Sequence, residues 1–235
     1  WRQRWRVRLP DDPTGPTIYL KRFSRPPLRR QIERWREGHA GWSTARIEYE
    51  NARLLAAAGV PGVAAIGVGE RMSGIVEYAS YILLSEVPGD ALERWLPREI
   101  TAGRRPWAGT AGARAVESLA RIIARFHAAG LIHRDLYLAH IFIHDDGSGE
   151  PAFRLIDLQR VFRPRGRRRR WIVKDLAALA FSTPAQVGTT TRLRFLCRYV
   201  RAYPGAGTAR DLGRRVGAKV SWMRRRAERV AARRR

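Results

Sequence analysis

The first third of the chain alternates apolar and polar positions in a way that predicts a small antiparallel sheet. Residues 5–9 alternate with period two, which is typical of half-buried strands, and further strands are predicted over residues 17–23, 64–69 and 75–84. The stretch 25–41 contains two consecutive prolines and several arginines, so we expect a loop or a short helix there.

One helix is predicted within this strand-rich region, over residues 44–58. Apolar side chains recur there at helical spacing, and Gly59 and Pro61 are expected to end the helix. Glu48 and Glu50 flank the apolar stripe on opposite sides, so periodicity does not decide which of them turns toward the sheet. Taken alone, each glutamate is better explained as a solvated helix charge.

The rest of the chain has a mainly helical pattern. An apolar stripe at helical spacing covers residues 116–126, and Gly130 is expected to end that helix. Later helices are predicted over residues 174–181, 191–202 and 209–232. The two patterns together predict an α+β protein with a strand-rich first domain, residues 1–87, and a larger helical second domain, residues 88–235.

Two short apolar runs interrupt the helical pattern, at residues 141–143 and 153–156. The segment between them is rich in turn-forming residues, so the two runs are expected to be the arms of a β-hairpin. Antiparallel arms place the start of the first strand beside the end of the second. We therefore expect Asp135, His140 and Asp157 to converge at one end of this hairpin.

Two carboxylates in such a position suit phosphoryl transfer, which depends mainly on positioning and on metal-held phosphates. Asp135 is placed to orient an attacking hydroxyl or accept its proton. Asp157 is placed to bind Mg²⁺, which prefers hard oxygen ligands. The alternative is a surface hairpin with incidental carboxylates, and the agreement of motif, hairpin and order disfavours it.

Lysine is scarce in this chain. Of its 46 basic residues, only three are lysines: Lys21, Lys174 and Lys219. Lys21 belongs to the strand predicted over residues 17–23, and a compact ammonium on a flexible stem suits a tight phosphate contact. We take Lys21 as a candidate phosphate ligand; the alternative is an ordinary edge-strand lysine that faces water.

The net charge of +25 over 235 residues implies an anionic partner. Arginines concentrate at residues 163–170 and 223–235. These basic patches predict contact with an anionic substrate or with an anionic membrane surface; the alternative is a solvated arginine-rich surface. No zinc spacing or nucleic-acid-binding module is recognisable, so we expect no specific nucleic-acid partner.

Cysteine usage and hydropathy bear on the compartment. The single cysteine, Cys197, excludes an intramolecular disulfide, as is common in a reducing cytoplasm. No apolar run is long enough for a transmembrane helix, and the basic N-terminal residues are not followed by the apolar core of a signal peptide. We expect a cytoplasmic protein.

The motifs resemble those of the bacterial lipopolysaccharide kinase family, which includes core heptose kinases and Kdo kinases. The matching segments are His-Arg-Asp-Leu-Tyr-Leu-Ala-His at 133–140, Leu-Ile-Asp-Leu-Gln-Arg at 155–160, and 170–179. The tyrosine and second histidine of the first motif favour the heptose-kinase branch. The resemblance extends from Tyr19 to the C-terminus.

The resemblance implies a bilobal protein-kinase-like α+β fold, with a small antiparallel-sheet N-lobe that contains one helix and a larger, mainly helical C-lobe. It also implies the activity. Such an enzyme transfers the γ-phosphoryl group of ATP, with Mg²⁺, to a heptose or Kdo hydroxyl of the lipopolysaccharide inner core. The first domain would then bind the nucleotide, and the second would bind the acceptor.

The resemblance also assigns roles to individual residues. Asp135 corresponds to the catalytic base or hydroxyl-orienting group, Asp157 to the metal-binding aspartate, and Lys21 to the phosphate lysine. Counting back from the end of the predicted helix favours Glu48 as the partner of the lysine. Asp175 resembles the buried aspartate that braces the catalytic loop, which is a structural role.

Three further features bear on nucleotide binding. The backbone of Glu86 and Val87 resembles the hinge that binds adenine in kinases. His140 stands where protein kinases have a metal-binding asparagine, which implies a single metal or a hydrogen-bonding role. No Gly-x-Gly-x-x-Gly motif precedes Lys21, so we expect a degenerate phosphate-covering loop, or a chain truncated at its N-terminus.

Two other functions fit parts of the pattern: a bacterial Ser/Thr-type protein kinase, and a basic non-catalytic pseudokinase that binds nucleic acid. The lack of Ala-Pro-Glu after Asp157 counts against the first. Retention of Lys21, Asp135 and Asp157 counts against the second. We expect the lipopolysaccharide core and lipid A as anionic substrate, and a location peripheral to the cytoplasmic face of the inner membrane.

Overall fold

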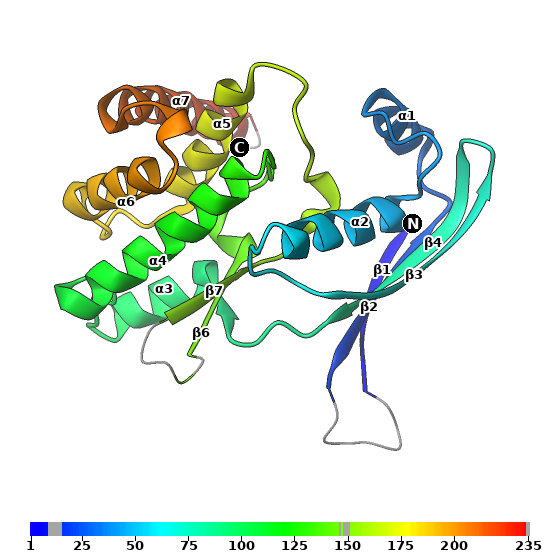
Figure 1. The fold of residues 1–235 in the computed structure, drawn as a ribbon, viewed down its shortest axis with the longest axis horizontal. Helices are drawn as coiled ribbons and strands as arrows, with labels where there is room; N and C mark the ends of the chain where they lie inside the picture. The colour runs from blue at the N-terminus through cyan, green and yellow to red at the C-terminus, as the bar shows by residue number, and fades with distance from the viewer. Residues whose placement is uncertain (9–15, 146, 148–150, 234–235) are drawn as a thin grey trace. The chain divides into compact units, whose positions relative to one another are not determined.

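A computed structural model describes most of the chain (Figure 1). The described residues are 1–8, 16–145, 147 and 151–233. The run Asp11-Asp-Pro-Thr-Gly15 predicts a turn before the strand of Lys21, and it lies outside the described residues, as do the last two arginines. The chain forms two compact units: Trp1–Val87 with Ile156–Val161, and Pro88–Leu155 with Phe162–Arg235. The segment 156–161, which the sequence pattern assigned to the second domain, groups with the first.

The first unit contains an antiparallel sheet with the strand order β1-β2-β4-β3. Its strands are β1 (Arg2–Val7), β2 (Ile18–Ser24), β3 (Ala65–Ser73) and β4 (Val76–Ser85). The four predicted strands are confirmed, although β1 begins earlier than expected. Lys21 on β2 lies opposite Ile82 on β4, and Ile82 and Phe23 are fully buried in the core of this unit.

Two helices accompany this sheet in the described part of the first unit, α1 (Leu28–Arg36) and α2 (Thr44–Ala57). The helix predicted over residues 44–58 is confirmed, and the stretch 25–41 forms a short helix, which was one of the two structures expected there. Arg34 anchors the additional helix, because its buried guanidinium donates to the backbone carbonyls of Ala40 and Ile75, both at 2.7 Å. A buried arginine with distant carbonyl partners cannot be distinguished by sequence pattern from the many solvated arginines of this chain.

The second unit contains the predicted hairpin. Its sheet has the order β5-β6-β7, with β5 (Asp90–Ala91), β6 (Ile141–Asp145) and β7 (Pro151–Leu155). Ile141 pairs with Leu155 in an antiparallel register, as expected. Gly89 enters this sheet with a φ of +87°, and a Cβ at that position would lie 1.9 Å from the carbonyl oxygen of Ile143. Only glycine fits there.

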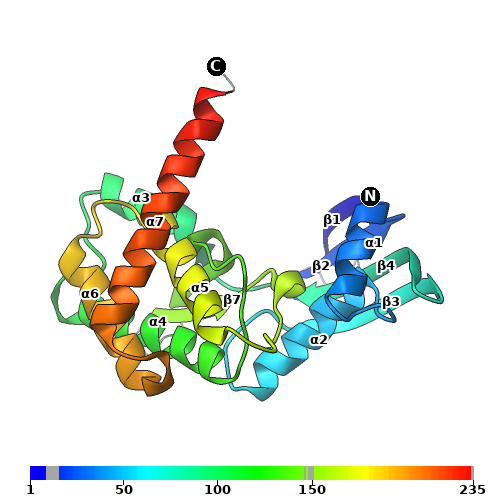
Figure 2. The same cartoon turned by 90° about the horizontal axis from the view of Figure 1, so that it is seen from above.

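Helices make up most of the described second unit. They are α3 (Leu92–Thr101), α4 (Gly109–Ala128), α5 (Arg168–Ser182), α6 (Thr189–Ala202) and α7 (Ala209–Ala232). Helix α4 packs against α6, and α5 packs against α7 (Figures 1 and 2). Ile123 and Phe126 of the predicted stripe are fully buried in this core, together with Leu131 and Leu155.

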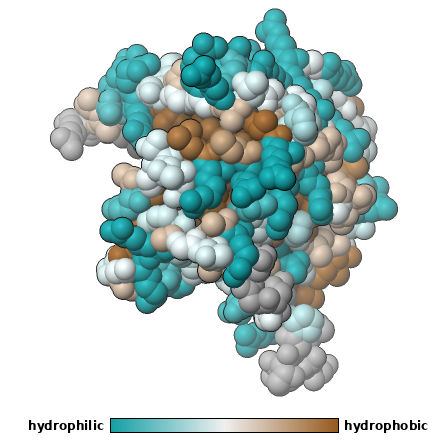
Figure 3. All heavy atoms as spheres, turned by 60° about the vertical axis from the view of Figure 1, so that its left-hand side comes forward, coloured by the Kyte–Doolittle hydropathy of each residue, from teal (hydrophilic) through white to brown (hydrophobic). Residues whose placement is uncertain are grey.

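The surface agrees with the basic, polar composition. On the face shown in Figure 3, hydrophilic side chains predominate and surround a patch of apolar ones. Within the described ranges, no helix is both long enough and apolar enough to cross a bilayer.

Candidate active site

Lys21 lies in a buried ion pair within the first unit. Its side chain extends from β2, and its ammonium Nζ lies 2.5 Å from Oε1 of Glu48 on α2. Lys21 is 5% exposed and Glu48 is fully buried. Glu50 instead pairs with Arg46 at 2.8 Å, on the more exposed side of the helix. The choice between the two glutamates, which periodicity left open, is therefore decided in favour of Glu48.

Asp157 lies beside the same lysine. Its Oδ1 is 3.5 Å from Nζ of Lys21 and 3.7 Å from a guanidinium nitrogen of Arg2 on β1. The Asp157 side chain is 21% exposed, whereas that of Glu48 is inaccessible. Of the two carboxylates near Lys21, one is therefore fixed in the protein interior and the other is accessible to a ligand. No pattern along the chain had pointed to Arg2.

The segment that contains Asp157 is fastened to α2 by Asn51. The buried amide of Asn51 donates to the backbone carbonyls of Leu158 and Val161, at 2.8 and 2.9 Å. Asp157 itself has a left-handed backbone, with a φ of +58°, which aspartate tolerates better than most residues. Asn51 lies one turn after Glu48, and a polar amide on the buried face of a helix was the signal that sequence reasoning overlooked.

Asp135 belongs to the second unit, in a loop that His140 closes. Nδ1 of His140 lies 2.7 Å from the backbone carbonyl oxygen of Asp135. A carbonyl can only accept, so Nδ1 must hold the proton, and in the neutral ring Nε2 is an acceptor. The ring of His140 also stacks on that of His133, with centroids 5.7 Å apart. His140 thus fixes the backbone of the residue expected to orient the acceptor.

Asp175 braces this loop from α5. The fully buried carboxylate accepts hydrogen bonds from the backbone N–H groups of His133 and Arg134, at 2.7 and 2.8 Å. Arg134 has a φ of +71°, a conformation that costs free energy in a residue other than glycine and persists only where its surroundings enforce it. The two bonds to Asp175 hold that conformation next to Asp135.

A second layer of buried polar groups supports Asp175. Nε2 of His127 lies 3.3 Å from the Asp175 carboxylate, and Nδ1 lies 2.8 Å from the Tyr199 hydroxyl. Burial raises the pKa of Tyr199 well above its ordinary value, so the phenol keeps its proton. Because a carboxylate accepts, Nε2 of His127 donates to Asp175. Sequence reasoning missed both residues, because each lies within a helix pattern that predicts only a core position.

Comparison with known proteins decides the family. The model of the lipopolysaccharide kinase (Kdo/WaaP) family matches residues 15–199. The chain belongs to this family. The predicted phosphotransferase class, a kinase of lipopolysaccharide, is confirmed by this membership.

Individual relatives agree. The chain is 36% identical over 194 residues to the lipopolysaccharide core heptose(I) kinase WaaP of Pseudomonas aeruginosa, a match that covers 79% of this chain and 68% of that protein. It is 29% identical over 168 residues to WaaP of Escherichia coli K12, which covers 67% of this chain and 59% of that protein.

A solved structure, WaaP in complex with acyl carrier protein, is similar with a TM-score of 0.70 and 29% identity. The likeness covers 97% of this chain and 84% of that one. The predicted α+β, protein-kinase-like fold is confirmed by this likeness.

The segment expected to bind adenine follows β4. The backbone N–H of Glu86 donates to the carbonyl of Thr17 at 3.0 Å, and the Glu86 carboxylate pairs with Arg6 at 3.1 Å. Among the described residues, no backbone hydrogen bond uses the Glu86 carbonyl or the Val87 N–H. Those are the groups that an adenine edge would use, and adenine binding here stays a prediction.

The residues present fit a Mg²⁺ ion that arrives with its nucleotide. Mg²⁺ is commonly held by one or two carboxylates together with substrate phosphates and water, and Asp157 offers one accessible carboxylate. The described residues contain no group of three or more His, Cys, Asp or Glu side chains that could hold a metal by themselves. Imidazole is a poor ligand for so hard a cation, so we assign no metal contact to His140.

The candidate residues thus form two sets. Lys21 contacts both Glu48 and Asp157 in the first unit, and His140 contacts Asp135 in the second. The predicted convergence of Asp157 with Asp135 and His140 involves both units, and it stays a prediction.

Proposed function

We propose that this kinase transfers the γ-phosphoryl group of ATP to a heptose hydroxyl of the lipopolysaccharide inner core. The observation that supports it best is the contact of buried Lys21 with Glu48 and accessible Asp157, since a phosphate-binding centre needs one cation and one metal-binding carboxylate. Heptose is favoured over Kdo because the curated relatives are core heptose(I) kinases.

Lys21 would contact the α- and β-phosphates of ATP. If its ammonium left Glu48, an unpaired carboxylate would remain buried in the protein interior, which is strongly unfavourable. Glu48 therefore fixes the position of the ammonium and leaves its other N–H donors for phosphate oxygens. The low exposure of both side chains strengthens that interaction, because it is poorly screened by water.

Asp157 would hold the Mg²⁺ that accompanies the nucleotide. When bound there, the ion would neutralise the negative charge on the β- and γ-phosphate oxygens. The 3.5 Å contact with Lys21 keeps the carboxylate beside the ammonium, and the two bonds from Asn51 keep its backbone segment on α2.

Asp135 would orient the acceptor hydroxyl and accept its proton as the new bond to phosphorus forms. A carboxylate in that role must be held in place, because general-base efficiency depends on hydrogen-bond reach. His140 restrains Asp135 through its carbonyl, and Asp175 restrains the two preceding residues. Glu86 and Val87 would bind adenine through their backbone.

Membrane association is part of the proposal: the enzyme would act at the cytoplasmic face of the inner membrane as a peripheral protein. The basic patches support it, although part of the first patch has an internal role. Arg168 donates to the backbone carbonyl of His127, and Arg169 pairs with Asp211. The exposed arginines at 163, 165 and 167 are left to meet anionic lipid.

A transfer assay tests the proposal. The full chain would be given ATP, Mg²⁺ and either of two glycolipids, one that ends in Kdo and one that ends in heptose. Radiolabel from γ-phosphate is expected only in the heptose acceptor. Label in the Kdo acceptor alone would reject heptose as the target, and a protein that binds no nucleotide at millimolar ATP would reject the kinase.

A further inference from the structure

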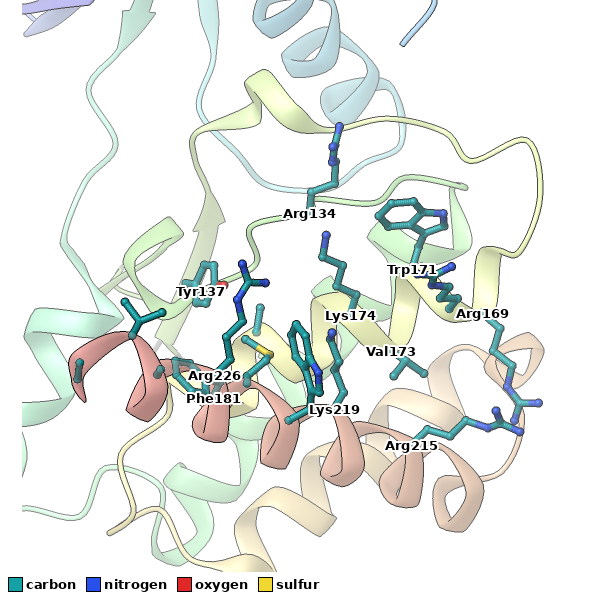
Figure 4. A pocket seen from close by; sticks show the side chains of 17 residues that line it. Arg134, Tyr137, Arg169, Trp171, Val173, Lys174, Phe181, Arg215, Lys219 and Arg226 are labelled. Atoms are coloured by element: carbon teal, nitrogen blue, oxygen red, sulfur yellow. The ribbon is translucent and has the colours of Figure 1, made fainter. Parts of the chain in front are cut away.

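Two of the three lysines are not explained by the phosphate site. Lys174 on α5 and Lys219 on α7 both line one cavity of the second unit, with a volume of about 1110 Å³ (Figure 4). In a chain where nearly every other basic residue is arginine, both remaining lysines extend into the same space. Arg134 and Tyr137 line it too. Both belong to the loop at residues 133–140, so the cavity adjoins the segment that contains Asp135.

Each of these lysines lies against a tryptophan. Nζ of Lys219 is 3.6 Å from the ring centroid of Trp222, and Nζ of Lys174 is 5.1 Å from that of Trp171. Arg226 also lies over the ring of Trp222, at 5.5 Å from its centroid. The aromatic rings hold the cations in position by cation–π attraction without neutralising their charge.

The cations at this end of the cavity repel one another. Burial lowers the pKa of Lys219, and the nearby charges of Arg170 and Arg226 lower it further. Among the described residues, no carboxylate forms an ion pair with Lys219 or Arg226. Positive charges gathered without a counter-ion would be stabilised by an anion from outside the protein.

The other end of the cavity is different. Asp211 neutralises Arg169 and Arg215, with a contact of 3.0 Å to the latter, and Figure 4 shows these two arginines away from Lys174 and Arg226. The protein therefore balances some of the charges that line the cavity and leaves others for a ligand. The unbalanced ones, Lys219 and Arg226, lie on α7 about two turns apart, on one side of the helix.

The wall beside these cations is apolar. It is formed by Phe181 of α5 and by Met223, Ala227 and Val230 of α7. From residue 217 to its end, α7 has no buried residue, and Val230 is 44% exposed. Figure 2 shows that the end of this helix extends beyond the other helices of its unit. A ligand with an aliphatic part would cover this surface.

We propose that the cavity between α5 and α7 binds the lipid portion of the acceptor, a phosphorylated and acylated glycolipid. Its phosphate would lie between Lys174, Lys219 and Arg226, and the first part of an acyl chain would lie along the apolar wall. The inference rests on the proposed function, because it takes the glycolipid to be the acceptor whose sugar reaches Asp135.

The position of the cavity favours this ligand over the nucleotide. The phosphate lysine of the nucleotide site, Lys21, belongs to the first unit, and ATP has no aliphatic part to cover Met223 and Val230. The volume also exceeds what a single sugar phosphate needs, since drug-sized ligands occupy pockets of about 300–1,000 Å³.

Direct binding without nucleotide tests the inference. A heptose-terminated glycolipid with its lipid A phosphates and the same glycolipid after dephosphorylation would each be titrated onto the full chain at fixed salt. The phosphorylated form is expected to bind at least about tenfold more tightly, as charge-assisted hydrogen bonds predict. Lys219→Gln should abolish most of this difference. Arg210→Gln removes an equal charge from an exposed position of α7 outside the cavity, and it should change affinity by less than about twofold.

The apolar wall is tested separately by Val230→Gln, which should weaken binding of the acylated glycolipid and leave that of its deacylated core unchanged. Equal affinity of the phosphorylated and dephosphorylated glycolipids, or an unaltered Lys219→Gln variant, would overturn the inference. It would also be overturned if acylated carrier protein bound through Lys219 while the glycolipid did not.

Failure of the proposed function gives a different result. In that case no phosphate is transferred and no nucleotide binds, while the glycolipid titration still reports on the cavity. If transfer occurs and Lys219→Gln leaves the KM for the glycolipid unchanged, the kinase stands and only the cavity assignment is rejected.

Discussion

The ammonium of Lys21 lies 2.5 Å from the carboxylate of Glu48, and both side chains are buried. Burying these two charges costs free energy, because each of them loses its hydration. A pair of this kind is therefore expected to serve a function. The pair positions a cation 3.5 Å from Asp157, the arrangement on which the proposed nucleotide site depends.

Comparison of Glu48→Gln with Glu50→Gln should distinguish the buried ion pair from the surface ion pair on the same helix. Loss of the buried charge leaves Lys21 with only the more distant Asp157 as counter-ion and should lower the free energy of unfolding by about 3 kcal/mol, with loss of ATP binding. Glu50→Gln removes the partially exposed partner of Arg46 and should cost less than about 1 kcal/mol. Urea unfolding and nucleotide titration measure both; equal effects of the two variants would contradict the assignment.

Asn51→Leu tests the attachment of the Asp157 segment. Leucine has a similar size but no donor, so the carbonyls of Leu158 and Val161 lose their partner, at a cost of roughly 2–3 kcal/mol. Hydrogen exchange should become faster at residues 156–161 before the β2 and β4 amides respond. Unchanged protection of that segment would show that other contacts hold it.

The motif residues and their neighbours differed in how well the sequence predicted them. Lys21 was distinguished by the scarcity of lysine, and the hairpin arms around residues 141 and 155 by apolar runs that flank turn residues. Asn51 and His127 were not, because their partners are backbone carbonyls or groups distant in sequence. Periodicity records which face of a helix is buried, but not which polar atom on that face is satisfied, or by what.

Asp175→Asn should loosen the catalytic loop. The replacement puts an amide N–H where one of the two backbone donors of His133 and Arg134 now finds an oxygen, so we expect a loss of about 3 kcal/mol of stability. Tyr199→Phe removes only the outer hydroxyl, which bonds His127, and should cost about 1 kcal/mol. Thermal unfolding measures both, and a larger effect of Tyr199→Phe would contradict the order of the network.

One feature of the fold could not be predicted from the order of elements along the chain. The sequence pattern divides the protein near residue 87, and the structure places Ile156–Val161 in the first unit despite its later position. A local pattern can predict the strand that ends at Leu155, yet it contains nothing about the amide of Asn51 that binds the residues beyond it.

Asp157→Asn should preserve the fold and impair the use of Mg²⁺. Asparagine tolerates the left-handed backbone at this position, so the unfolding temperature should stay close to that of the wild type. An uncharged amide is a weaker ligand for Mg²⁺ than a carboxylate, so half-maximal activity should require a higher Mg²⁺ concentration. If the Mg²⁺ dependence is unaltered, another residue holds the metal.

Single-turnover phosphate transfer by Asp135→Asn tests the role of this chain as a kinase most directly. The variant should bind ATP and glycolipid as the wild type does and unfold at the same temperature, while the rate of transfer to the heptose acceptor falls by at least about 100-fold, as expected for loss of a general base. Transfer at the wild-type rate would contradict the account.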